Sequence, residues 1–132
     1  MLDLPKAWPK RIALFALAIA FVAAGGNHFV NPEFFLAIMP PYLPAHLELV
    51  RLSGAFEIAG GIGVLIPAWR SAAGWGLVAL LIAVFPANLH MALHPELFSD
   101  VSSLGLYLRL PIQLLFIAWA YWATRADPAA PQ

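Results

Sequence analysis

The chain contains no cysteine, and only 11% of its residues are charged. Without cysteine it can form no disulfide, thiolate nucleophile, Cys-ligated metal site or dithiol relay, and redox chemistry does not fix its compartment. Seven Lys and Arg residues balance seven Asp and Glu residues, so no net field favours nucleic acid or an acidic partner. Soluble domains have about 25% charged residues. The shortage of charge therefore indicates a membrane protein.

What the chain has instead is apolar sequence, with a hydrophobic fraction of 62% and a mean hydropathy of +0.81. A helix needs about 20 mostly apolar residues to cross a bilayer. We therefore predict an all-α integral membrane four-helix antiparallel bundle, in a single transmembrane domain over residues 1–132. Four stretches reach the required length: about 11–30, 47–69, 72–94 and 104–124. The first could be a cleaved signal peptide, but its helical pattern continues to Val30, and we expect it to be retained.

Cationic residues gather at one set of stretch ends: Lys6, Lys10, Arg11, Arg70 and Arg125. The alternate connections, about residues 31–46 and 95–103, contain no Lys or Arg. All five tryptophans also lie near the cationic ends, as expected for residues that favour the membrane interface. Because cytoplasmic loops are enriched in Lys and Arg, we expect both termini to be cytoplasmic. We expect the tail from Asp127 to Gln132 to be frayed.

The first connection is too apolar for an ordinary loop. Pro32 suits the first position of a helix with Asn31 as its N-cap, and Pro40 and Pro41 would end that helix. We expect a short helix lying on the outer interface or folded over the mouth of the bundle. A simple apolar connector is the alternative.

Polar residues occur in the same half of every stretch, away from the cationic ends. They are Asn27, His28, Arg51, Ser53, Glu57, Asn88, His90, Arg109 and Gln113. Ionisable groups at membrane depth cost on the order of 3 kcal/mol each, so they mark candidate functional positions. The asymmetry predicts a polar pocket that opens to the outside and is closed toward the cytoplasm.

Glu57 is the main candidate, because Gly54, Gly60 and Gly61 surround it on its helix. Small residues let helices approach closely, so this carboxyl should face another helix. It either clips the second stretch to the fourth by a hydrogen bond, or binds a ligand or a proton. Arg109 is its expected counter-ion.

Arg51 competes as the counter-ion, although it could instead reach the outer interface. Gln113 shares a helix face with Arg109 at i, i+4. Asn88 is either a helix-to-helix hydrogen-bond donor or a ligand contact, and His28 either caps its helix or turns into the mouth. The candidate ligand-binding residues are therefore Glu57, Asn88, Arg109, Gln113 and His28.

His90 and His94 are spaced i, i+4, which suits two ligands of a metal or haem. A metal site needs three or more ligands, and the only further candidate at this level is His28, with Glu57 lying deeper. We therefore predict no metal-ligating residue, and no catalytic residue, because the sequence has no nucleophile–base pair or cofactor signature.

Several motifs resemble the DoxX-like family of small four-helix bacterial membrane proteins. They are Gly26-Asn-His-Phe with Pro32, Pro41-Tyr-Leu-Pro44, Ser53-Gly-Ala-Phe-Glu-Ile-Ala-Gly-Gly-Ile-Gly-Val-Leu-Ile-Pro67 and Phe85-Pro-Ala-Asn88. The resemblance covers about residues 10–124 and implies a bacterial inner (plasma) membrane, a four-helix bundle, and a site around Glu57, Asn88 and His28. The family is associated with a quinone-linked oxidase or thiosulfate oxidation. Its cysteine-based redox branch does not carry over to a chain without cysteine.

The first functional hypothesis is an accessory membrane subunit that binds a lipophilic cofactor, such as a quinone or a lipid, between polar groups and apolar walls that include Phe85 and Phe116. The second is an assembly or scaffolding protein for a membrane oxidoreductase or other complex, with a purely structural polar cluster. A stand-alone enzyme ranks third. The lipid bilayer is the expected surrounding, and nucleic acid is not an expected partner.

Overall fold

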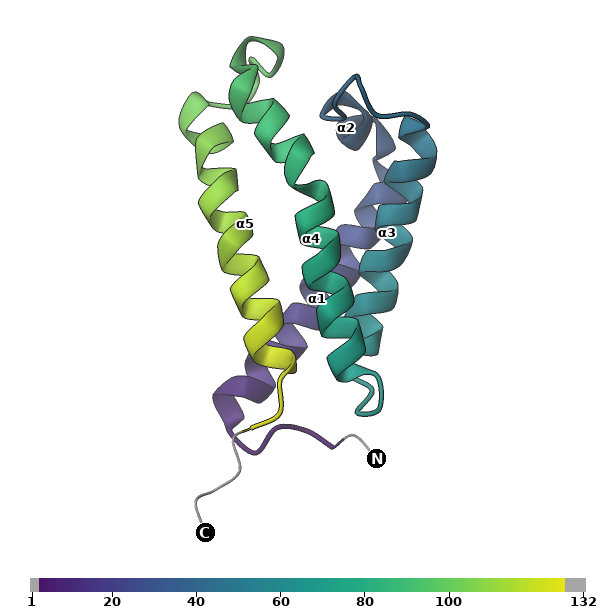
Figure 1. Ribbon diagram of the computed structural model, residues 1–132, viewed down its shortest axis with the longest axis vertical. Helices are drawn as coiled ribbons and strands as arrows, with labels where there is room; N and C mark the ends of the chain where they lie inside the picture. The colour runs from purple at the N-terminus through teal and green to yellow at the C-terminus, as the bar shows by residue number, and fades with distance from the viewer. Residues whose placement is uncertain (1–2, 128–132) are drawn as a thin grey trace.

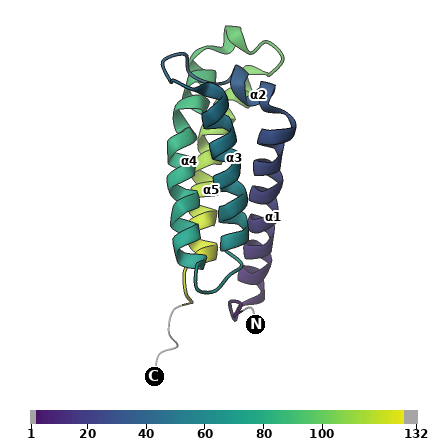
Figure 2. The same ribbon diagram turned by 90° about the vertical axis from the view of Figure 1, so that its right-hand side faces the viewer.

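Four long helices form the body of the protein (Figure 1). The structure is a computed structural model and describes residues 3–127. The elements in order are α1 (Trp8–Val30), α2 (Pro32–Ala37), α3 (His46–Gly63), α4 (Arg70–Leu93), the 3-10 turn η1 (Pro95–Leu97) and α5 (Ser103–Thr124). The long helices alternate in direction, and α1 packs on α3 and α5 while α4 packs on the same two (Figures 1 and 2). The short helix α2 lies across the end of the bundle opposite the described chain ends.

Three of the helices, α1, α4 and α5, are long and apolar enough to cross a membrane. The fourth, α3, is 18 residues long and carries Glu48, Arg51 and Glu57. The prediction of an all-α membrane protein is confirmed at this level.

The second predicted stretch is helical only as far as Gly63, well before its expected end at Trp69. Pro67 has no N–H and glycines weaken the preceding turns, so the chain passes through turns between residues 64 and 69. The Arg70 guanidinium satisfies carbonyls at this helix end. Its Nε donates to the Val64 carbonyl at 2.8 Å, and a terminal nitrogen donates to that of Leu65 at 3.4 Å.

Helices α1 and α3 cross at glycines. A Cβ on Gly25 would lie 2.5 Å from the Gly54 carbonyl oxygen, and a Cβ on Gly54 would lie 2.6 Å from the His28 Cβ. One heptad away, a Cβ on Gly61 would lie 2.9 Å from the Ala18 carbonyl oxygen. Contact at backbone distance is the packing that small residues permit between apolar helices. The glycines around Glu57 therefore do bring its helix against another, which is α1.

Two apolar clusters fill the bundle at different levels. The larger lies toward the described chain ends and consists of Leu14, Leu17, Ala18, Phe21, Val64, Leu77, Val78, Ala120 and Ala123. The smaller lies at the α2 end and consists of Ile38, Met91 and Leu106. The predicted polar half of the bundle lies on the α2 side of the larger cluster, whose residues are all apolar.

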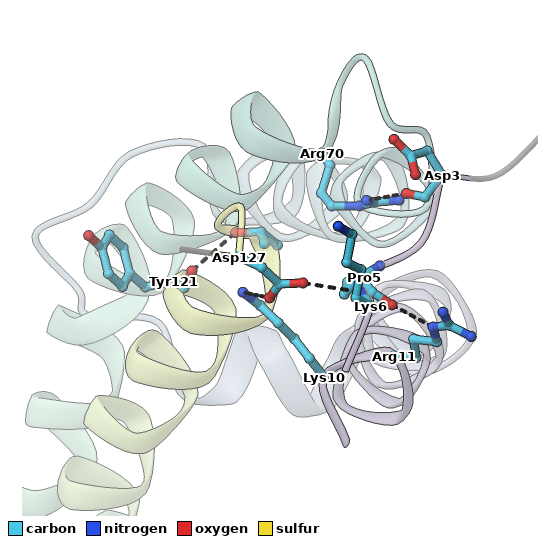
Figure 3. A network of polar contacts seen from close by, with 9 residues as sticks. Asp3, Pro5, Lys6, Lys10, Arg11, Arg70, Tyr121 and Asp127 are labelled. Atoms are coloured by element: carbon cyan, nitrogen blue, oxygen red, sulfur yellow. Dashed lines mark hydrogen bonds and ion pairs between the residues drawn. The ribbon is translucent and has the colours of Figure 1, made fainter. Parts of the chain in front are cut away.

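Asp127, in the segment after α5, is bonded both to α1 and to the segment before it (Figure 3). The Lys10 Nζ lies 3.1 Å from an Asp127 carboxylate oxygen, and the Lys6 backbone N–H donates to the other oxygen at 3.1 Å. Asp127 is thus held in place, contrary to the expectation of a frayed tail from this residue. The remainder of that expectation, residues 128–132, lies outside the described residues.

The glycine crossing yields a stability prediction with an internal control. Gly54→Ala should lower the free energy of unfolding by about 1–3 kcal/mol, because overpacking forces the helices apart. Gly26→Ala should be neutral or gain about 0.5–1 kcal/mol, since a Cβ there meets nothing within 4 Å and alanine favours helix. Thermal unfolding of both variants in detergent measures the difference. Equal melting temperatures would contradict the crossing.

The Asp127 contacts yield a pH prediction. The Lys10 side chain, and then the Lys6 N–H, lower the pKa of Asp127 below its usual value. A carboxyl whose pKa is lower in the folded than in the unfolded state stabilises the fold at pH values above its unfolded-state pKa of about 3.9. This contribution is lost as the pH falls through the folded-state pKa. Asp127→Asn should therefore melt at a lower temperature than wild type at pH 7, with the gap closing below about pH 4. Asp100→Asn, in the exposed connection at the other end, is the control. A gap that persists in acid would contradict the assignment.

Candidate functional site

A cavity of about 160 Å³ opens inside the α2 end of the bundle. Its polar lining consists of His28 from α1, Ser53 and Glu57 from α3, Asn88 from α4 and Arg109 from α5. Phe34, Phe35, Ile38 and Met39, from α2 and the turn after it, form much of the apolar wall. Side chains from all five α-helices therefore meet at one site, and four of the five predicted ligand-binding residues line it.

His28 and Glu57 are the buried pair of the site. The His28 Nδ1 lies 2.9 Å from the Val50 carbonyl oxygen, and its Nε2 lies 3.5 Å from the Glu57 Oε2. Their side chains are 9% and 12% exposed. The His28 ring also stacks on Phe35 of α2, with centroids 3.8 Å apart. The imidazole thus joins α1, α3 and α2 at one point.

This geometry constrains the protonation of the pair. A carbonyl oxygen can only accept, so the His28 Nδ1 carries a hydrogen and donates it to Val50. In a neutral imidazole, Nε2 is then an acceptor that faces a carboxyl oxygen. Two facing acceptors are unfavourable unless a proton lies between them, on Glu57 as the neutral acid or on His28 as imidazolium. A proton on either partner would make this contact favourable, although at 3.5 Å no hydrogen bond joins the two side chains in the structure.

Arg109 does not pair with Glu57, which corrects the predicted counter-ion. Its guanidinium carbon lies 5.9 Å from the centroid of the Phe34 ring, a cation–π contact with α2. Arg51 is exposed and does not line the cavity, so neither arginine neutralises the carboxyl. The predicted clip from Glu57 to the fourth stretch is likewise replaced by the contact with α1.

Asn88 and Gln113 form the clip between α4 and α5. The Asn88 Nδ2 donates to the Gln113 Oε1 at 2.5 Å, and the Gln113 Nε2 donates to the Leu81 carbonyl. Gln113 is 5% exposed and lies one helical turn deeper than Arg109. Asn88 is thus the helix-to-helix hydrogen-bond donor that the sequence offered as one alternative, and it also lines the cavity. Gln113, which was predicted to contact the ligand, does not line the cavity and positions Asn88 instead.

The apolar walls also differ from the prediction. Phe85 is 37% exposed on the outside of α4. Phe116 packs against Phe21 and Trp119 beside the larger apolar cluster, away from the cavity. Phe34 and Phe35 of α2 and the turn after it provide much of the wall instead, together with Leu49 and Val50 of α3 and Val84 and Ala87 of α4. The proline-bounded apolar connection was the sequence signal for the α2 residues, since a short helix with nothing to span must bury its aromatic side chains nearby.

His90 and His94 lie near the start of the loop that contains η1. Their ring centroids are 4.5 Å apart, and the His94 Nδ1 lies 3.0 Å from the His90 carbonyl oxygen. Within residues 3–127, no group of three or more His, Cys, Asp or Glu side chains could hold a metal ion. The two histidines are also not among the residues that line the cavity.

Comparison with known proteins places the chain in a family but not in a functional class. Searches of curated proteins and of solved structures gave no match. Residues 17–124 match a family described as "Domain of unknown function (DUF8561)". This span contains α2, α3, α4 and most of α1, together with all of α5 and every residue that lines the cavity. The chain belongs to the DUF8561 family.

Proposed function

We propose that the protein is an accessory subunit of a bacterial inner membrane that binds the polar head group of a lipophilic molecule, with a quinone as the best fit, in the cavity under α2. The observation that carries this proposal is the composition of the cavity. Hydrogen-bonding side chains from α1, α3, α4 and α5 converge on a space that α2 covers with aromatic and aliphatic groups. Small-molecule sites combine apolar walls with a few convergent polar groups in this way.

The chemistry of the lining favours a ring with carbonyl oxygens. Arg109 has five N–H donors, and Asn88 has a second amide hydrogen beyond the one given to Gln113. Phe34 and Phe35 offer aromatic faces for stacking. A proton on His28 or Glu57 would be available to an oxygen that gains or loses charge. Because drug-sized ligands occupy about 300–1,000 Å³, a cavity of about 160 Å³ suits a single head group whose tail continues into lipid.

In this proposal all four long helices cross the membrane and both termini are cytoplasmic. Helix α3 is about 27 Å long at 1.5 Å per residue, close to the hydrocarbon thickness, and its deepest charge faces His28. The α2 end, without Lys or Arg in its connections, faces outward. Helix α2 then lies at the outer membrane interface and covers the site. The resemblance to the DoxX-like family, which is associated with a quinone-linked oxidase, agrees with a quinone as the ligand.

The second candidate is a scaffold for a membrane oxidoreductase or another complex. The clip from Asn88 through Gln113 to the Leu81 carbonyl favours it, because these groups satisfy one another without a ligand. Purification from native membranes separates the two functions. A stoichiometric protein partner that survives Arg109→Gln supports the scaffold, and a co-purified small molecule without protein supports the binding function.

Quinone binding tests the first proposal. Arg109→Gln should weaken the binding of a short-chain ubiquinone to purified protein by at least about tenfold, since hydrogen bonds from charged donors contribute about 1.5–3 kcal/mol. Arg51→Gln removes an exposed arginine from the same end of the bundle and should leave the affinity unchanged. No binding to the wild type, or equal losses in both variants, would exclude the proposal.

Thiol labelling tests the orientation, because the chain has no cysteine of its own. Single cysteines at Asn88 and Ser53, which line the cavity, should react with an impermeant reagent applied to intact cells. Cysteines at Ala79 and Ala118, on the outer surface of the apolar half, should be shielded by lipid. Labelling of the cavity positions from the inside of inverted vesicles alone would reverse the topology.

A further inference from the structure

A larger cavity, of about 430 Å³, lies at the opposite end of the protein. It is lined by the segment before α1 (residues 3–6), the start of α4 with Pro67, and the end of α5 with the segment after it (residues 124–127). Figure 3 shows part of this region, where Arg70, Lys6 and Asp127 converge from three separate parts of the chain. None of its residues belongs to the lining of the cavity under α2.

The charge lining this cavity is positive. Lys6, Arg70 and Arg125 provide three cations, against the carboxylates of Asp3 and Asp127. Asp127 is already paired with Lys10, which lies outside the lining, at 3.1 Å. The lining therefore has three cations, and Asp3 is its one carboxylate that is not paired with Lys10.

The two arginines are held in place by neutral groups. Arg70 donates to the carbonyl oxygens of Val64 and Leu65, and to that of Asp3 at 2.7 Å. Arg125 donates to the Ser71 carbonyl at 3.0 Å, and its guanidinium carbon lies 4.8 Å from the centroid of the Trp75 ring. These partners orient the guanidinium groups without cancelling their charge. The buried Nε of Arg125 has no hydrogen-bond partner among the described residues.

The position of this cavity relative to the membrane indicates which anions can reach it. Helices α1, α4 and α5 are long enough to cross the bilayer, so their ends lie at the level of the lipid head groups. Trp8, Trp69 and Trp75 are more than half exposed around this end, as suits the interface. Basic pockets between helices at that level bind anionic head groups.

We propose that this cavity binds the phosphate of an anionic phospholipid head group. Lys6, Arg70 and Arg125 supply the charge, and the N-terminus of α4, which has no side-chain cap, adds the positive end of its helix dipole. The proposal uses the membrane crossing of the helices and is independent of the ligand under α2.

Native mass spectrometry of the delipidated full chain tests the site, with phosphatidylglycerol and phosphatidylcholine as probes. Phosphatidylglycerol should bind at least about fivefold more tightly, and Lys6→Gln should lower its affinity by about fivefold without affecting phosphatidylcholine. Lys6→Gln keeps the backbone N–H that Lys6 gives to Asp127, so this variant retains the contact between the chain ends. Arg125→Gln should have an effect at least as large.

Arg51→Gln, which removes a cation at the other end of the bundle, is the matched control and should bind phosphatidylglycerol like the wild type. Inorganic phosphate, compared with chloride at equal ionic strength, distinguishes the sources of the anion. Displacement by phosphate shows that the phosphate group alone is recognised, and persistence of the lipid adduct shows that the head group must come with its lipid. Equal affinity for the two lipids, or an equal loss in Lys6→Gln and Arg51→Gln, overturns the proposal.

Discussion

The close approach of α1 and α3 at Gly25 and Gly54 is the constraint on which the site depends. Only backbone-to-backbone contact at this level lets His28 reach the Val50 carbonyl with one nitrogen and Glu57 with the other. An isolated charge on either residue would cost on the order of 3 kcal/mol at membrane depth. The two side chains face each other at 3.5 Å, so each can compensate for a charge on the other. A larger residue at Gly54 would separate the helices and remove that compensation.

The remaining parts of the site are built around this pair. Phe35 stacks on the His28 ring, so α2 is anchored to the same residue that holds α1 and α3 together. On the opposite wall, Gln113 bonds both Asn88 and the Leu81 carbonyl, and this fixes α4 against α5. Below them the larger apolar cluster fills the bundle, and the Trp119 Nε1 donates to the Ala13 carbonyl at 3.0 Å to join α5 to α1. The polar lining of this site thus lies at the α2 end, and the larger apolar cluster separates it from the opposite end.

Much of this arrangement could be predicted from residue types along single helices. Hydropathy predicted the all-α membrane class, and the polar residues in corresponding halves of the stretches predicted that His28, Glu57, Asn88 and Arg109 would share one site. Contacts between residues of different helices were harder to predict, because periodicity shows which face of a helix is buried but not which helix packs against it. Because arginine and glutamate have long side chains, Arg109 was a reasonable partner for Glu57. The glycines, however, pack α3 against α1, and this places Glu57 beside His28.

The other differences have similar causes. Phe85 lies one residue before Pro86 and looked like part of the wall, yet its position on α4 turns it outward. Pro67 and the glycines indicated that α3 would weaken, but its end at Gly63 also involves Arg70, which donates to the Val64 and Leu65 carbonyls. That contact is not specified by a local pattern.

Photolabelling with an azido-quinone in native membranes tests the central claim most directly, because it locates the ligand without assuming which side chain binds it. The account predicts that the label is attached to residues that line the cavity, such as Phe35, Ser53 or Ala87, and that excess unlabelled quinone prevents the reaction. Attachment that excess quinone does not prevent, on lipid-facing positions such as Leu114 and Leu115 of α5, would contradict it.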